Sequence, residues 1–322
     1  MLLMMATNSA TGQNAPIADY HQHIFSPTIA ALLAPAGAIK PNGTGGISAR
    51  DLVALLDSAG IRHALLLSVA YMFGSPSRAF DDEYAKVQAE NDWTAAQAAE
   101  YPDRLRAFCS FNPLKPYAVK ELERCARIPG LSHGIKLHFG NSDVQLDNPE
   151  HVERVKRVFL AANAHRMTIV VHLRASVSKR RPYGAAQADT FLKQLLPLVP
   201  DIDVQVAHLA GTGPGYDDPQ ADSAMAVLAE AMERRDPRTR RLRFDVASVV
   251  DSGISPSQAA LVVKRIRQVG VDRILYGSDA PVGTNLRPRE GWAAFRRLPL
   301  TKKEFDRIAS NVTPYLIDQH SE

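Results

Sequence analysis

Histidine and aspartate side chains follow several short apolar runs in this sequence. His21 and His23 lie one residue apart after the first run, His172 and His208 close two later ones, and Asp279 follows the last. A single histidine at the end of a strand is more often a half-buried structural residue than a ligand. Neutral imidazoles together with a carboxylate, however, are the ligand set that suits zinc or a similar divalent ion. Taken together, these residues predict a metal site.

The spacing of the first two histidines supports this interpretation. Successive side chains of a strand point to opposite faces, so His21 and His23 would point to the same side, as chelation requires. Lys136 lies in another apolar run, "GIKLH", and is a further candidate for the same site.

Such a site needs strands whose ends meet at one place. Eight apolar segments bounded by Gly, Asp or Pro have the composition of strands buried on both faces. They are Ile17–Tyr20, His63–Val69, Leu105–Phe111, Gly134–His138, Thr168–His172, Asp203–His208, Leu242–Ala247 and Arg273–Gly277. Amphipathic helical patterns alternate with them, which predicts a single-domain (β/α)8 TIM barrel with the candidate residues at its carboxyl-terminal mouth. An open doubly wound sheet is the alternative, but no glycine-rich turn follows the first strand.

The helical segments carry clear start signals. Asn148, Asp218 and Ser255 each precede a proline, and each would cap a helix whose first residue is that proline. Gln258 and the pair Thr301 and Glu304 add two capping boxes. Helical spacing of apolar residues follows over Asp51–Ala59, Val152–Ala164, Ser223–Arg234 and Ala259–Val269.

Composition limits the possible partners. The chain has 322 residues, 45% of them hydrophobic, and a net charge of +4. Lys179–Arg181 is the only tight basic run, so neither nucleic acid nor a membrane is an expected partner. Cys109 and Cys125 are expected as buried, reduced thiols.

The start of the chain, residues 1–15, is expected as a disordered tail or signal remnant, and residues 16–318 as the barrel domain. A cytoplasmic protein is expected, with the periplasm as the alternative if the start is a truncated signal peptide.

The segments "HQH", "VVHL", "VAHLAG" and "YGSDAP" occur in the order typical of the amidohydrolase superfamily, and the resemblance runs from Ile17 to Leu316. Details such as "LYGSDAP" are most similar to its amidohydrolase-2 branch, which contains hydrolases, lactonases and non-oxidative decarboxylases. The resemblance implies that His21, His23, His172 and Asp279 hold a divalent metal, for which zinc is the expected ion. It also implies that His208 binds a second ion or handles protons beside the substrate.

Whether Lys136 is carboxylated decides whether the site holds one metal ion or two. In two-metal relatives a lysine at this position reacts with carbon dioxide, and its carbamate bridges the ions. An unmodified ammonium cannot bind a dication and would repel it. Unmodified, Lys136 would instead anchor a substrate carboxylate or a developing oxyanion.

The leading hypothesis is hydrolysis of an ester, lactone or amide bond in a small, carboxylate-bearing substrate. A bound cation lowers the pKa of water, and Asp279 would take the released proton and pass it to the leaving group. Arg174 could grip the substrate carboxylate, although an ion pair at the barrel rim explains it equally well. Tyr71 and Asn112 follow other strands and could line the pocket.

Two alternatives remain at this stage. A metal-dependent decarboxylase of an aromatic or unsaturated acid would use the same ligands around one ion, with Asp279 or His208 protonating the carbon. A catalytically silent barrel would lack a ligand, and none is missing. The sequence leaves the oligomeric state open, a homodimer included.

Overall fold

The computed structural model of this chain describes residues 15–34, 47–280 and 285–317. Almost the whole of the predicted N-terminal tail, residues 1–14, lies outside the described residues. Among the helices described, none is long and apolar enough to cross a membrane.

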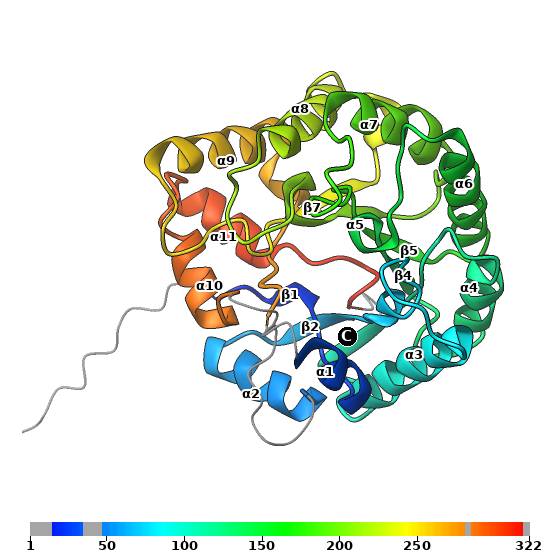
Figure 1. The fold of residues 1–322 in the computed structure, drawn as a ribbon. Helices are drawn as coiled ribbons and strands as arrows, with labels where there is room; N and C mark the ends of the chain where they lie inside the picture. Colours follow the sequence, from blue (N-terminus) through cyan, green and yellow to red (C-terminus); the bar gives the residue numbers. More distant parts are fainter. Residues whose placement is uncertain (1–14, 35–46, 281–284, 318–322) are drawn as a thin grey trace, which may run out of the picture.

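Eight parallel strands form one sheet whose spatial order follows the chain, with helices around it (Figure 1). The strands are β1 (Ala18–Gln22), β2 (His63–Leu67), β3 (Leu105–Ser110), β4 (Gly134–His138), β5 (Thr168–His172), β6 (Val204–Val206), β7 (Leu242–Asp245) and β8 (Ile274–Leu275). Just beyond β8, the Tyr276 carbonyl accepts a hydrogen bond of 2.8 Å from Tyr20 N of β1, which joins the last strand to the first. The predicted (β/α)8 barrel is confirmed.

The helices begin where the predicted caps stand. The side chains of Asn148, Asp218 and Ser255 accept backbone N–H groups at the starts of α6 (Pro149–Ala164), α8 (Pro219–Glu233) and α9 (Pro256–Val269). Both predicted capping boxes form, at α9 and at α11 (Lys302–Ser310). The remaining α-helices are α1 (Pro27–Leu33), α2 (Ala49–Ala59), α3 (Glu83–Ala99), α4 (Ala118–Ala126), α5 (Phe139–Ser142), α7 (Ala185–Thr190) and α10 (Pro288–Phe295).

Five strands (β2, β3, β6, β7 and β8) are shorter than predicted, β6 and β8 by the most. β6 ends at Val206, and residues 207–210 form the short helix η5 (Ala207–Ala210) instead of continuing to His208. β8 covers only Ile274–Leu275, so Gly277 and Asp279 lie beyond the strand, where its regular pairing no longer fixes the backbone conformation.

The apolar residues divide into two clusters. The larger one lies between the strands and the surrounding helices, and it includes the buried, unpaired Cys109 and Cys125, as predicted. The smaller one holds Tyr20, Leu67, Phe108, Val170 and Leu275 together with Tyr315 from the end of the chain. It fills the barrel below the mouth, and we call it the barrel floor.

Candidate metal centre

A cavity of about 370 Å³ lies where the carboxyl ends of the strands meet. It is lined by His21, His23, Phe25, Leu33, Val69, Tyr71, Met72, Lys136, His138, Asn141, His172, His208, Thr212, Gly213, Pro214, Asp279 and Asn285. Strands at opposite sides of the sheet thus contribute to one site, as expected for a barrel of this type.

An irregularity in β1 turns its histidines into this cavity. Ala18 and Tyr20 belong to the barrel floor, so regular alternation would point His21 away from the interior. The pairing with β2 shifts between Asp19 and Gln22, where β1 has one residue more than its partner. His21 and His23 therefore both line the cavity, directly above Tyr20.

His21, His23 and Asp279 form a compact group of potential ligands. Asp279 Oδ1 lies 3.2 Å from His23 Nε2 and 3.6 Å from His21 Nε2. Burial alone would raise the pKa of Asp279, but its hydrogen bond with His23 and the nearby rings of His21 and His208 outweigh burial and hold this pKa well below its ordinary value. The carboxylate is therefore ionised at neutral pH, the form that binds a metal.

Hydrogen bonds behind the rings orient the histidines. His21 Nδ1 donates to Asp245 Oδ2 (3.0 Å). His23 Nδ1 donates to the Leu67 carbonyl (2.7 Å), and His208 Nδ1 donates to the Ala247 carbonyl (2.7 Å). In each ring Nε2 is the nitrogen that can bind an ion once it carries no proton, an arrangement common among metal-binding histidines. In His23 this nitrogen faces Asp279 Oδ1 at 3.2 Å. These donors fit a divalent metal.

Asp245 is a member of the site that the sequence analysis missed. Its Oδ2 accepts from His21 Nδ1 and from Gln205 Nε2, and its Oδ1 accepts from the His208 backbone N–H. Burial would raise the pKa of Asp245, but the His21 and His208 rings lower it well below its ordinary value. His21, His208 and Asp245 are close enough to form a second potential ligand group, yet both Asp245 oxygens are already in use. The predicted strand Leu242–Ala247 runs past Asp245, so no strand-end signal marked this residue in the sequence.

His208 lies in an unusual turn rather than in a strand. His208, Leu209 and Ala210 have consecutive positive φ angles of 54°, 48° and 64°, a conformation that costs non-glycine residues about 1–2 kcal/mol each. The hydrogen bond from His208 N to Asp245 Oδ1 (2.9 Å) offsets part of this cost. Asp279 also has a positive φ, of 57°. The strain falls on two candidate catalytic residues, as is common at functional sites.

Gly277 lets the chain beyond β8 approach β1 closely. A Cβ at this position would lie 2.8 Å from His21 Cβ and 3.0 Å from Ala247 Cβ. Any side chain here would displace His21.

Lys136 is buried beside the ligand group. Its Nζ lies 3.1 Å from His21 Nε2. Burial lowers the pKa of Lys136 to about 8, and the charges of Asp245 and Asp279 oppose this effect.

His172 lines the cavity but belongs to neither ligand group found among the described residues. Its ring stacks on His138, with centroids 3.9 Å apart and planes 17° from parallel, and lies 5.1 Å from the His208 ring. His138 was also missed in the sequence. It ends β4 two residues after Lys136, which places both on the same face of the strand.

Of Tyr71, Asn112 and Arg174, which were predicted to contact the substrate, only Tyr71 lines the cavity. Tyr71, in the short helix η2 (Ala70–Met72), lines the cavity. Asn112 Nδ2 donates to the Gly74 carbonyl (2.7 Å), and its side chain supports the loop outside the cavity. Arg174 Nε pairs with Asp218 Oδ2 at 2.7 Å, and its guanidinium lies 4.8 Å from the centre of the Tyr183 ring. Arg174 is thus in a rim ion pair and is not among the residues that line the cavity.

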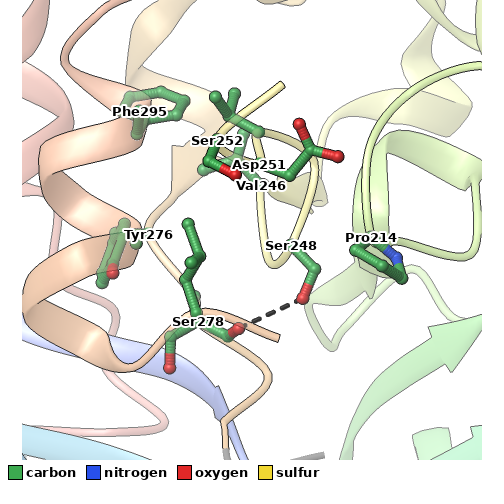
Figure 2. Close-up of a pocket in the computed structure, with 12 residues that line it drawn as sticks. Pro214, Val246, Ser248, Asp251, Ser252, Tyr276, Ser278 and Phe295 are labelled. Atoms are coloured by element: carbon green, nitrogen blue, oxygen red, sulfur yellow. Dashed lines mark hydrogen bonds between the residues drawn. The ribbon is translucent and has the colours of Figure 1, made fainter. Parts of the chain in front are cut away.

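A second cavity of about 210 Å³ lies between the loops after β7 and β8 and helix α10, and Pro214 lines both cavities (Figure 2). Ser248 Oγ donates to the Ser278 carbonyl at its base (3.1 Å). Serine hydroxyls, the Asp251 carboxylate and apolar side chains line this cavity, and no histidine is among its described lining residues. The potential metal ligands are therefore confined to the first cavity.

The amidohydrolase family model matches residues 18–311. No curated protein matches the sequence significantly. A solved structure of 5-carboxyvanillate decarboxylase from Sphingomonas paucimobilis is similar to 92% of this chain and 97% of its own, with 17% identity and a TM-score of 0.60.

Two further solved structures illustrate the range of reactions on this fold. Dihydroxybenzoic acid decarboxylase from Polaromonas sp. JS666, with bound manganese, has 17% identity, 92% and 95% coverage of the two chains, and a TM-score of 0.59. A probable 2-pyrone-4,6-dicarboxylic acid hydrolase from Acinetobacter baumannii has 18% identity, 92% and 96% coverage, and a TM-score of 0.53. At these identities the likeness establishes the fold alone.

Proposed function

Because this chain belongs to the amidohydrolase family, we propose that it is a metal-dependent hydrolase that opens an ester, lactone or amide bond in a small carboxylic acid. His21, His23, His172 and Asp279 would hold the ion, with His208 and a carboxylated Lys136 completing a site for a second one. When bound, the metal would lower the pKa of a water molecule and polarise the carbonyl group of the substrate. Zinc and manganese both suit these ligands, and manganese is present in one of the similar structures.

The contact between Lys136 and His21 carries the proposal. Lys136 Nζ lies 3.1 Å from His21 Nε2, the nitrogen that would face the metal. One lone pair cannot serve an ammonium group and a metal ion together, so metal binding requires Lys136 to release His21 Nε2, either by moving away or by carboxylation. Reaction of its neutral amine with carbon dioxide forms an N–C bond and releases a proton, which turns a repelling cation into a carboxylate ligand. Carboxylation of Lys136 would favour a two-metal hydrolase, whereas an unmodified Lys136 would anchor a substrate carboxylate.

Asp279 and His208 have distinct parts in this reaction. The ionised Asp279 carboxylate is held by Asn285 Nδ2, which donates to its Oδ2 (2.7 Å), and it would take a proton from the attacking water. It would then return that proton to the leaving group. His208, whose Nδ1 is bound to the Ala247 carbonyl, would present Nε2 to the substrate or to a second ion.

A non-oxidative decarboxylase is the second candidate. His21, His23 and Asp279 alone form a ligand group compact enough for a single ion. More of the similar structures are named as decarboxylases of aromatic acids than as hydrolases. In that reaction the bond between the ring carbon and the carboxylate breaks, carbon dioxide leaves, and Asp279 or His208 supplies the proton that replaces it.

Metal analysis combined with intact mass spectrometry tests the proposal. The full chain is purified with zinc or manganese in bicarbonate, and Lys136→Met is compared with Lys156→Met, a surface control. We expect two ions and one added carbon dioxide per wild-type chain. The added carbon dioxide and the two-ion content should be lost in Lys136→Met and kept in Lys156→Met. One ion with an unmodified lysine would overturn the two-metal form.

A reaction screen separates the two candidate functions. Ring opening of 2-pyrone-4,6-dicarboxylate or of simple lactones is followed alongside carbon dioxide release from 2,6-dihydroxybenzoate. Hydrolysis without carbon dioxide release is the expected result, and the opposite pattern would establish the decarboxylase.

A further inference from the structure

One wall of the cavity carries hydrogen-bonding groups that the described fold does not use. Tyr71 in η2, His138 at the end of β4 and Asn141 in α5 all line the cavity. In a barrel of eight strands β4 lies opposite β8, so His138 and Asn141 lie across the cavity from Asp279. Asp279 is the only acid among the described lining residues, so this wall has no negative charge of its own.

His138 has the opposite tautomer to the metal-facing histidines. Its Nδ1 accepts a hydrogen bond of 3.1 Å from the Asn141 backbone N–H. A nitrogen that accepts from an N–H group carries no proton, so the proton of this neutral ring must lie on Nε2. That Nε2–H has no partner among the described residues, and the ring lines the cavity. His138 therefore offers a donor where His21 and His208 offer lone pairs.

Asn141 and Tyr71 extend this donor surface. Asn141 Oδ1 is buried without a partner, and its Nδ2 likewise has none among the described residues. Nδ2 is the donor that a carboxylate could use, whereas Oδ1 can only accept and would need a hydroxyl group or a water molecule beside the carboxylate. The Tyr71 ring packs against His138, with centroids 4.9 Å apart, and its hydroxyl has no partner in the described part of the chain. Burial raises the pKa of Tyr71 above its ordinary value, so the hydroxyl keeps its proton.

We propose that His138 Nε2–H, the Asn141 amide and the Tyr71 hydroxyl together form a carboxylate subsite, which binds the substrate at its carboxylate group while the scissile bond lies at the metal. The inference rests on the proposed function, because it takes the cavity as the active site. A carboxylate has two oxygens and accepts several hydrogen bonds, so it can satisfy all three donors. A substrate ammonium group fits this wall less well, since His138 Nε2–H can only donate and leaves Asn141 Oδ1 and the Tyr71 oxygen as its acceptors.

This subsite explains why Arg174 is not needed at the cavity. Neutral donors bind a carboxylate without adding positive charge next to the divalent ions. They also fix its direction, because each donor is on a rigid element: η2 and α5 pack against each other, and Ser75 Oγ donates to the Asn141 carbonyl (3.2 Å).

Binding of benzoate to the metal-loaded full chain, measured by calorimetry, tests the subsite. His138→Phe keeps the ring stacked on His172 but loses the donor, and Asn141→Asp replaces an amide by a repelling charge. Each is expected to weaken benzoate binding about tenfold or more, as for loss of a hydrogen bond to a charged group. His138→Gln, which keeps an N–H donor, should restore most of the affinity. Benzylamine should not bind to wild type.

His151→Phe is the matched control, because His151 Nδ1 also accepts a backbone N–H group, from Gln145 (3.1 Å), outside the cavity. It should bind benzoate like wild type. An imidazole ¹⁵N spectrum supplies a readout that packing changes do not mimic: His138 should show a protonated Nε2 whose signal shifts when benzoate is added.

Metal content is measured for every variant, which separates this inference from the proposed function. Full metal content with unchanged benzoate affinity in His138→Phe and Asn141→Asp would overturn the subsite and leave the metal centre intact. Wild-type protein that holds metal but takes up no benzoate would overturn the subsite too. Wild-type protein that binds no metal would instead contradict the proposed function.

Discussion

The mouth and the floor of the barrel interior are built by the same strands in opposite ways. β5 places Val170 in the floor and His172 in the mouth, and β1 places Tyr20 in the floor and His21 in the mouth. In the floor, the hydroxyls of Tyr20 and Tyr315 are paired, the first accepting from Thr313 N (2.8 Å) and the second donating to Gln205 Oε1 (2.9 Å). In the mouth, His138 Nε2, the Tyr71 hydroxyl and the Asn141 side-chain amide have no partner among the described residues.

Gln205 connects the two regions. Because its Oε1 accepts from Tyr315, its Nε2 is turned to Asp245 Oδ2 (2.7 Å), which in turn accepts from His21 Nδ1. The floor therefore stabilises the fold and also supports a ligand of the mouth. This contrast teaches that unpaired polar groups belong where a ligand completes them, and paired ones where they hold the structure.

The largest expected effect comes from removing the paired histidines of the mouth. His21→Ala combined with His23→Ala should abolish metal binding while the barrel stays folded, because the floor does not involve these rings. The loss should far exceed the roughly 10–100-fold cost of losing an outer hydrogen-bonding partner. Metal analysis and circular dichroism check this result, with His151→Ala and His165→Ala as the control pair. Full metal occupancy in the first variant would refute the ligand assignment.

A change in the barrel floor should instead lower the stability of the fold and leave the metal ligands in place. In Gly134→Ala, the new Cβ would lie 2.3 Å from Phe108 Cε2 and 2.6 Å from the Thr168 carbonyl, so buried groups must shift. The free energy of unfolding should fall by roughly 1–3 kcal/mol or more, as for other overpacked cores. Urea unfolding measures the loss, with Gly130→Ala as a control whose Cβ would lie 3.4 Å from that of Ala95. Equal stability of the two variants would show that the floor is not tightly packed.

Asp245→Asn tests the hydrogen bond between His21 Nδ1 and Asp245 Oδ2. The amide can still accept from His208 N through Oδ1, but its NH₂ group would face His21 Nδ1–H and favour the other tautomer of the ring. Metal affinity should fall about 10–100-fold. Titration with zinc or manganese measures it, and Asp203→Asn, at the opposite end of the barrel, is the control. An unchanged affinity would mean that Asp245 does not orient His21.

The smallest effect is expected for Tyr315→Phe. Loss of the hydroxyl leaves Gln205 Oε1 without its partner and should cost about 1 kcal/mol of unfolding free energy. Metal content should stay at the wild-type value, because His21 and Asp245 keep their own contact. Thermal unfolding and metal analysis are measured on the same sample. A loss of metal as large as that in Asp245→Asn would mean that the floor and the mouth are not separate in function.

Local signals in the sequence were sufficient for most of the fold. The β-branched and leucine-rich segments predicted all eight strands, and the caps at Asn148, Asp218, Ser255 and Thr301 placed four helix starts. These features depend on residues only a few positions apart, so they can be read from the chain directly. The same strand-end rule indicated His21, His23, His172, His208 and Asp279, and applied to β4 it would also have indicated His138. Asp245 lies inside the predicted strand Leu242–Ala247, so the rule does not mark it.

The sequence by itself determined which residue types stand at the strand ends, and hence the barrel and the kind of chemistry at its mouth. Only the tertiary structure decided how those residues are presented. The irregularity in β1 turns His21 inward. The left-handed turn at His208 depends on a hydrogen bond to Asp245 from another strand, and Arg174 forms an ion pair with Asp218. The tautomers of His21, His23, His208 and His138 are likewise set by a partner from elsewhere in the chain or from a backbone turn. The physical reason is that hydrogen-bond direction depends on contacts between distant segments, which no local pattern records.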